Sequence, residues 1–303
     1  MMTRPVATVR RYRLGVELRR LREHAGVTQE TAGECIDADD SKISRVESGR
    51  SPLSRPELVE LLRLYGVTEE HEAFAGLIEL NRESRRRGWW QQPGVIGRAP
   101  AQLIDLETSA STVFEFSPLL VPELLQTERY AGAALAAAEG AAETETERAV
   151  RIRLQRQELL DRPDGPELDF VLDEAVLHRP VGGPRVQAEQ LRRLAALAGR
   201  ERLTVRVVPF TGGAHAGTAG SGGGFRLFGY SGPPRAEYGC AEQRDGRVLI
   251  EDGEAAGPYR EAAGRLHGQA LGAEESVKLI GAVAERMAAR APERAPERAP
   301  GQG

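Results

Sequence analysis

Residues 27–50 read VTQETAGECIDADDSKISRVESGR, and this stretch decides the fold of the N-terminal part of the chain. Thr28 and Asp39 belong to the residue types that most often cap the N-terminus of a helix, and Gly49 belongs to the type that most often follows its end. The stretch therefore predicts two short helices that are separated by a tight turn at Asp37.

The residues on either side predict three more helices. Before the stretch, apolar side chains recur at the spacing of one helix face and Gly26 follows as a stop: Leu14, Leu18, Leu21 and Ala25. After it, Ser54 caps a fourth helix, and Leu77 lies in the apolar stripe of a fifth. Two short helices around a tight turn, braced by three others, describe an all-α helix-turn-helix domain.

The pattern also indicates how the two short helices pack. Ile43 and Val46 of the third helix face inward. Gly33 in the second helix is about 1 kcal/mol less favourable than alanine, which is tolerable if another segment must approach closely there. We interpret Cys35 as a core thiol of the second helix.

Composition limits the class of protein. The chain has 303 residues, which suggests two domains, and its net charge of −4 excludes a uniformly basic protein that coats nucleic acid. No apolar run approaches the roughly 20 residues that span a bilayer, and the N-terminus lacks the apolar core of a signal peptide. Two cysteines exclude a disulfide framework. We therefore expect a cytoplasmic protein with no membrane contact.

Basic residues are unevenly placed. Up to Val27 the chain carries seven arginines against two glutamates, which gives a local positive charge inside an acidic molecule. Lysine occurs only at Lys42 and Lys278, and this arginine usage fits the GC-rich coding sequence of an actinomycete.

The pattern divides the chain into five segments. We expect a flexible basic arm, a helix-turn-helix domain, a linker containing Trp89-Trp90, a mixed domain and a disordered tail that repeats APER: residues 1–12, 13–84, 85–100, 101–288 and 289–303. In the mixed domain, strand-like runs alternate with helical patterns: residues 168–172, 203–208, 225–230 and 247–251. The expected fold class is α+β, an all-α five-helix domain followed by a larger domain with a small mixed sheet.

The stretch at residues 27–50 resembles the Xre-type, phage-repressor-like helix-turn-helix domain, whose second half runs Ser-x-Ile-Ser-Arg-apolar-Glu-x-Gly. Gly33 stands where that family has a helix-packing alanine, and Asp37 stands where it has a turn glycine. In related domains an arginine and a glutamate occupy the positions of Arg22 and Glu47. The resemblance implies a buried ion pair between these two residues.

Phrases across nearly the whole chain are similar to the WhiJ-like regulators of actinomycetes: RRRGWW, FEFSPLLVPELLQTERYA, RLQRQELL, LDFVLDEAVLHRPVGG and VRVVPFTGGAHAG. This resemblance implies a DNA-binding transcriptional regulator whose C-terminal domain has an uncertain biochemical role. It also implies a small protein partner that is encoded nearby.

The resemblance places the third helix in the major groove of double-stranded DNA, with its outward residues toward the bases. Lys42 and Arg45 can donate to guanine, and Asp40 can accept from cytosine. Thr28 and Gln29 begin the second helix, where they can contact a phosphate. The DNA-binding residues are therefore expected to be Thr28, Gln29, Asp40, Ser41, Lys42, Ser44 and Arg45. The alternative is that these polar residues only form the solvated face of a helix. For Asp40 and Ser44, DNA contact and a solvated face are equally supported by the sequence.

The sequence gives little support for an enzymatic function. The five histidines lack the spacing of metal ligands, and the glycine-rich segment 212–224 lacks the Lys-Ser/Thr of a phosphate loop. We read that segment as a mobile hairpin loop, although it could close over a small ligand. A hydrolase would need residues to converge that the sequence cannot bring together, such as Asp169, Asp173, Glu174, His178 and Ser221. We expect no enzyme, no metal and no cofactor.

The sequence thus favours a sequence-specific transcriptional regulator, as a repressor, that works as a homodimer held by residues 101–288. One short recognition helix reads only a few base pairs, so doubling it is the usual solution. The alternative is an antitoxin-like interaction module that binds a small partner protein and autoregulates its own operon. Trp89 and Trp90 are interpreted as packing at the domain junction rather than as a stacking platform for bases.

Overall fold

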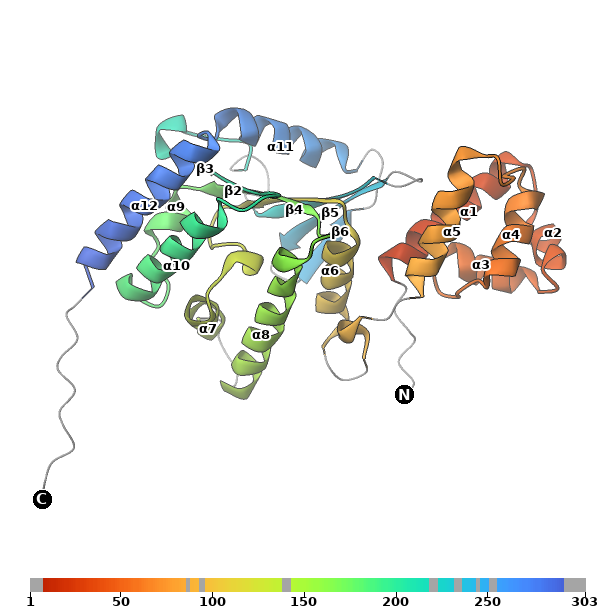
Figure 1. Ribbon diagram of the computed structural model, residues 1–303, viewed down its shortest axis with the longest axis horizontal. Coiled ribbons are helices and arrows are strands. Elements are labelled where there is room, and N and C mark those ends of the chain that lie inside the picture. The colour runs from red at the N-terminus through yellow and green to blue at the C-terminus, as the bar shows by residue number, and fades with distance from the viewer. Residues whose placement is uncertain are drawn as a thin grey trace, which may run out of the picture. The chain divides into compact units, whose positions relative to one another are not determined.

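The computed structural model describes residues 8–85, 88–92, 96–137, 143–217, 223–231, 236–243, 246–250 and 255–291. Its helices are α1 (Val9–His24), α2 (Gln29–Cys35), α3 (Asp40–Glu47), α4 (Arg55–Leu64), α5 (Glu72–Ser84), α6 (Arg98–Ser109), α7 (Glu128–Ala136), α8 (Glu143–Arg156), α9 (Ala175–His178), α10 (Pro184–Leu197), α11 (Gly257–Gln269) and α12 (Ala273–Ala289) (Figure 1). Its strands are β1 (Thr112–Ser117), β2 (Glu167–Asp173), β3 (Leu203–Val208), β4 (Phe225–Tyr230), β5 (Ala236–Gln243) and β6 (Gly246–Ile250). None of the described helices is long and apolar enough to cross a membrane.

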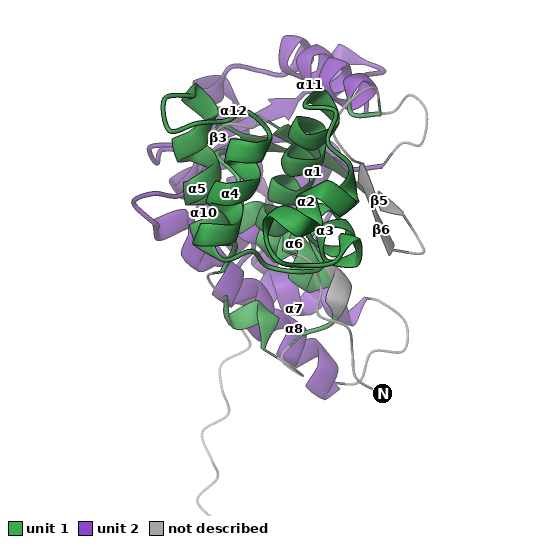
Figure 2. Ribbon diagram, turned by 90° about the vertical axis from the view of Figure 1, so that its right-hand side faces the viewer, with its two compact units in different colours: residues 1–113, 227–256 green, residues 114–226, 257–303 purple. Residues whose placement is uncertain are grey.

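The fold is α+β, as predicted: five helices come first, and a mixed region follows. The strands form one sheet in the order β3-β2-β1-β4-β5-β6, with β2 and β3 parallel and β5 and β6 antiparallel. The chain forms two compact units, residues 1–113 with 227–256 and residues 114–226 with 257–303 (Figure 2). Each unit is described by itself below.

Helices α2, α3 and α4 begin where the sequence predicts. Thr28, Asp39 and Ser54 are the N-caps of α2, α3 and α4, and each side chain accepts a hydrogen bond from a backbone N–H of the first turn. Asp37 lies in the turn between α2 and α3 with φ of 52°. The helices enclose one apolar core: Leu14, Leu18, Leu21, Ala32, Ile43, Val46, Leu53, Leu58, Leu61, Leu62, Tyr65, Val67, Leu77 and Leu80.

Two glycines let the backbone segments of this domain come unusually close. A Cβ at Gly33 would lie 2.7 Å from the carbonyl oxygen of Ala38, so the close approach expected at this position is confirmed. A Cβ at Gly15 would lie 2.5 Å from the carbonyl oxygens of Val46 and Glu47, which brings α1 directly against the end of α3. The end of α3 therefore packs on α1 at Gly15 without an intervening side chain.

Cys35 is exposed, and the prediction of a core thiol is wrong. Helix α2 buries Ala32 and Gly33, and Cys35, its last residue, lies to the side of this buried face. The thiol instead lies at the helix end, 3.8 Å from the carbonyl oxygen of Glu60.

The predicted flexible arm at residues 1–12 is wrong from Val9 onward, because α1 begins there. The backbone N–H of Val9 donates to the carboxylate of Asp105 in α6, and Arg10 donates to the carbonyl oxygen of Thr108 at 3.2 Å. Arg10 also pairs with Glu83 at 3.5 Å. These contacts hold the first turn of α1 against α5 and α6. Residues 1–7 lie outside the described part of the chain.

The linker predicted at 85–100 agrees with the structure only in part, and much of the predicted tail and loop lies outside the described residues. In the linker predicted at 85–100, a short 3-10 helix spans Trp89–Gln91 and α6 already begins at Arg98. The two indoles meet edge to face, with ring centroids 6.0 Å apart, and both are half-buried. Most of the tail predicted at 289–303 lies outside the described residues, as do residues 218–222 of the predicted mobile loop.

In the second unit, β2 and β3 carry helices on both faces. Leu168, Phe170 and Leu172 alternate along β2 and are buried on one face of the sheet. Helix α12 packs against both α10 and β3, and α11 lies on the opposite side of these strands (Figure 1). The opposite face of β2 carries Asp169, Val171 and Asp173.

Candidate DNA interface

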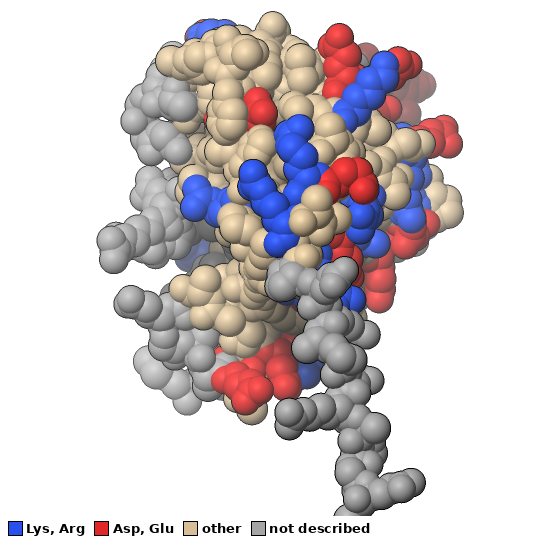
Figure 3. Space-filling view, turned by 90° about the vertical axis from the view of Figure 1, so that its left-hand side faces the viewer, with Lys and Arg blue, Asp and Glu red and all other residues tan. Residues whose placement is uncertain are grey.

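Charge alone does not locate a DNA-binding surface on this protein. Lys and Arg side chains also gather in the middle of the face that Figure 3 displays, with Asp and Glu at its margin. Helices α2 and α3 themselves expose acids beside their basic residues: Glu30, Glu34, Asp37, Asp39 and Asp40. The interface must therefore be located from the geometry of the helix-turn-helix.

Helix α3 has an inward and an outward face. Ile43 and Val46 are buried, as predicted. Asp40, Ser41 and Ser44 are exposed on the other side. The side chain of Asp39 caps the helix, because it accepts a hydrogen bond from the backbone N–H of Lys42. This N–H at the start of α3 therefore has a partner within the protein. The outward residues are thus available to another molecule.

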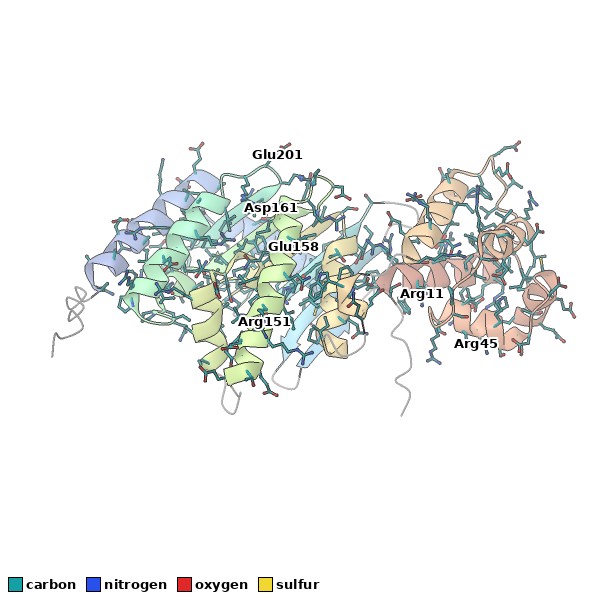
Figure 4. All side chains as sticks on the ribbon, turned by 60° about the horizontal axis from the view of Figure 1, so that its bottom comes forward. Arg11, Arg45, Arg151, Glu158, Asp161 and Glu201 are labelled. Atoms are coloured by element: carbon teal, nitrogen blue, oxygen red, sulfur yellow. The ribbon has the colours of Figure 1, made fainter. Side chains whose placement is uncertain are left out.

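Arg45 is the most open basic residue of this face, with 51% of its side chain exposed. Figure 4 shows it on the outside of the helical region. Its guanidinium donates to the hydroxyl of Ser41 at 2.9 Å and lies 3.8 Å from the carboxylate of Asp39. Both contacts are solvent-exposed and weak, so the guanidinium can exchange them for a stronger acceptor.

Lys42 is less free than the sequence suggests. Its ammonium group pairs with the carboxylate of Glu57 in the first turn of α4, and only a quarter of each side chain is exposed. Glu57 also accepts from the backbone N–H of Ser54 at 2.6 Å, which completes the capping box of α4. Burial raises the pKa of Glu57, but the bonds from Lys42 and Ser54 outweigh it and lower the pKa to about 2.

Gln29 is held by an internal partner. Its amide Nε2 donates to Glu47 at 2.8 Å, and Glu47 also accepts from Arg22 at 2.6 Å and 3.1 Å. The predicted buried Arg22–Glu47 ion pair is confirmed. One acid at the end of α3 therefore connects α1, α2 and α3 and orients the side chain of Gln29. Thr28 is exposed, and its hydroxyl accepts from the N–H of Thr31 at 3.1 Å.

Two exposed arginines beside α3 did not stand out in the sequence. Arg50 follows the end of α3 and Arg55 begins α4, and neither side chain has an ion pair or hydrogen bond within the described residues. The sequence does indicate that Arg50 and Arg55 flank the turn between two capped helices. Only the fold shows that this turn lies next to the outward face of α3.

Three of the acids that an enzyme would need are each paired with a histidine. Asp173 pairs with His215 at 2.8 Å, Glu174 with His178 at 3.2 Å and Asp169 with His267 at 2.6 Å: each acid has its own histidine. Ser221 lies outside the described residues. No cluster of three or more potential metal ligands occurs in the described part of the chain.

Two known families match separate parts of the chain. Residues 13–74 match the family described as a helix-turn-helix domain. Residues 100–282, well over half of the chain, match the family described as a domain of unknown function (DUF5753). No curated protein and no solved structure matches.

Proposed function

The chain belongs to the DUF5753 family and carries a helix-turn-helix domain at its N-terminus, and from this we propose that it is a sequence-specific transcriptional repressor of the Xre type, in a WhiJ-like arrangement. The helix-turn-helix domain indicates a DNA-binding regulator. The subfamily, the repressing action and the roles of individual residues are the proposal.

The observation that carries the proposal is the two-sided construction of α3. Its inward side is fixed by Ile43, Val46 and the Arg22–Glu47 ion pair, so the helix has one orientation. Its outward side presents Asp40, Ser41, Ser44 and Arg45 without apolar residues among them. A rigid helix with an open polar face is what reading base edges in the major groove requires.

Residue roles follow from this construction. Arg45 and Lys42 read bases, and Lys42 exchanges its partner Glu57 for a guanine when DNA binds. Thr28 and Gln29 contact a phosphate at the start of α2. Arg50 and Arg55 add phosphate contacts on the neighbouring turn, because they are exposed and have no partner within the described residues. Asp40, Ser41 and Ser44 complete the contact surface.

The protein acts as a homodimer in the cytoplasm, and a small protein encoded nearby modulates it. One recognition helix reads a few base pairs, and two helices spaced by about 34 Å read a palindromic site. The α+β region supplies the dimer contacts and receives the partner. Sedimentation of the full chain at micromolar concentration, alone and with its operator, tests this part independently of DNA binding.

The decisive experiment is fluorescence anisotropy of the full chain on fragments of its own upstream region, with a scrambled fragment as reference. The expected result is salt-sensitive binding that prefers one fragment by at least 1,000-fold, within the usual range for specific binding. Arg45→Ala removes much of that preference. Arg82→Ala is the matched control, because Arg82 is an exposed arginine of α5 that pairs with Glu79. Equal affinity for both fragments overturns the proposal.

A further inference from the structure

Asp169 and His267 form an open pair on the sheet face beneath α11. The Nε2 atom of His267 lies 2.6 Å from Oδ2 of Asp169, and about one third of each side chain is exposed. The histidine ring meets the ring of Phe114 edge to face, with centroids 5.2 Å apart. Solvent therefore reaches an imidazole that is hydrogen-bonded to Asp169 and packed against the ring of Phe114.

Arg206 lies on the same face, on the neighbouring strand. The parallel register pairs Asp169 with Thr204 and Val171 with Arg206, so the side chains of Asp169 and Arg206 point to one side of the sheet. Helix α11, which carries His267, also packs against β3. The three groups thus come from adjacent elements and share one face.

Arg206 has no counter-charge among the described residues. In the part of the chain that the structure describes it forms neither an ion pair nor a hydrogen bond, and its Nε atom is buried without an acceptor. A half-buried guanidinium in this condition is costly, because it has lost water without gaining a partner. Arg226 on strand β4 shows the usual solution, because it pairs with the buried Glu115 at 2.8 Å.

Asp169 carries a matching unsatisfied atom. Its Oδ1 is buried and accepts no hydrogen bond, whereas Oδ2 is occupied by His267. The other His–Asp pair of this face is complete: Asp173 accepts from His215 and from the N–H of Ala175, and Nδ1 of His215 accepts from the N–H of Gly217. The protein thus supplies the polar partners of the His215–Asp173 pair. The His267–Asp169 pair keeps an unpaired carboxylate oxygen and shares its sheet face with Arg206.

We propose that Arg206, His267 and Asp169 form a binding site for a small phosphate-bearing ligand. The guanidinium of Arg206 donates to the phosphate oxygens, for which its planar fork is suited. His267 approaches the same group with its free ring nitrogen, and Oδ1 of Asp169 accepts from a hydroxyl of the ligand. A ligand with both an anionic phosphate and a hydroxyl satisfies both orphaned atoms at once. The site is independent of the DNA-binding function.

Equilibrium dialysis of the full chain against labelled inorganic phosphate, at constant ionic strength, tests the anionic half of this site. The expected result is saturable binding of one phosphate per chain. Arg206→Met lowers the affinity at least tenfold, and Arg206→Lys lowers it less, because lysine keeps the charge but not the fork. Arg192→Met is the matched control, because Arg192 is an exposed arginine of α10 whose partner is Glu285.

Two further measurements separate ligand binding from a structural role and from the DNA surface. Because Arg206 forms no ion pair or hydrogen bond within the described residues that methionine would lose, Arg206→Met leaves the thermal midpoint of the ligand-free chain unchanged or raises it. Arg45→Ala leaves phosphate binding unchanged, since it alters only the outward face of α3. Absence of saturable binding overturns the proposal, as does equal binding by Arg206→Met and wild type. A clear fall in the midpoint of Arg206→Met would show a structural arginine instead.

Discussion

Arg22 of α1 donates two hydrogen bonds to Glu47 at the end of α3, although both side chains are at least nine-tenths buried. Glu47 accepts a third bond from Gln29 of α2. The pair therefore does more than join two helices: it sets the angle at which α3 leaves the core and the direction of the first side chain of α2. Breaking it would disturb the surface that we propose to face DNA without touching an outward residue of α3.

Replacing Arg22 by methionine leaves the Glu47 carboxylate buried without its cation, and we expect a loss of about 3–5 kcal/mol in the free energy of unfolding. Urea denaturation followed by circular dichroism measures it. Arg19→Met is the control, because Arg19 pairs with Glu23 in solvent and its loss should change the stability little. Similar losses in the two variants would show that the Arg22–Glu47 pair contributes little.

Glu57 predicts a pH dependence. Its pKa is about 2 in the folded chain and 4.5 in the unfolded reference, so its carboxylate stabilises the fold at neutral pH and the contribution is lost as pH falls from about 4.5 to about 2. At 1.36 kcal/mol per unit, the contribution is at most roughly 3 kcal/mol. We expect Glu57→Gln to be less stable than wild type at pH 7 and to approach it at pH 3. Parallel stability curves for the two proteins would contradict this assignment.

The outward residues of α3 should divide their roles on DNA. Arg45→Ala and Lys42→Ala should each weaken operator binding by roughly 1–3 kcal/mol and relax the preference at one or two base pairs. Gln29→Ala should weaken binding about equally on all sequences, because a phosphate contact positions without specifying. The ratio of operator to scrambled-site affinity separates the two classes. If Arg45→Ala and Lys42→Ala keep that ratio, α3 does not read the site.

Lys42 offers a sharper version of the same test. Glu57→Gln removes the negative partner of its ammonium group, so a base-reading lysine should bind operator more tightly in this variant at neutral pH. The capping role of residue 57 is largely kept, because the glutamine oxygen can still accept from Ser54. Operator affinity that is unchanged in Glu57→Gln would indicate that Lys42 stays paired when DNA is bound.

The Gly33→Ala substitution should destabilise the chain, although alanine is usually preferred to glycine in a helix. Alanine is favoured by about 1 kcal/mol in a helix interior, but its Cβ would lie 2.7 Å from the carbonyl oxygen of Ala38, which is backbone and cannot swing aside. We expect net destabilisation of about 1–3 kcal/mol. Gly132→Ala in α7 is the control, because nothing lies within 4 Å of its added Cβ, and it should stabilise the chain. A stabilised Gly33→Ala would refute the close approach.

Asp37→Gly should stabilise the turn. A left-handed conformation costs an L-residue about 1–2 kcal/mol, and glycine escapes that cost at the φ of 52° found here. Part of the gain is offset by the greater freedom of glycine in the unfolded chain, so we expect about 0.5–1 kcal/mol. Asp37→Asn keeps a residue that tolerates this region while removing the charge, and thermal unfolding of both variants separates backbone strain from electrostatics.

The helical region could be predicted from sequence because its signals are local. Thr28, Asp39 and Ser54 each mark a helix start by a bond that spans three residues, and the apolar spacing of α1 and α3 needs no partner to be recognised. The core position of Cys35 was predicted wrongly, because the buried face of α2 is the side of Ala32 and Gly33 and Cys35 lies beside that face. The arm was predicted wrongly, because its order comes from Asp105, almost a hundred residues away.

The sheet was only partly predictable for the same reason. Strand β1 was not predicted, because its alternation is hidden: after Thr112 all its residues are buried, and Glu115 lies among them only through its pair with Arg226. The pairing of acids with histidines was equally out of reach. Asp169 and His267 are 98 residues apart, and no local spacing brings them together.

The two faces of α3 separate what the fold requires from what a target sequence selects. Stability rests on Ile43, Val46 and Glu47, while Asp40, Ser41, Ser44 and Arg45 contribute almost nothing to the core. Those four positions can therefore change in duplicated copies of the gene without a penalty in folding. Paralogues in one genome would then diverge to separate promoters by a few exchanges on one helix, each copy keeping the same scaffold throughout.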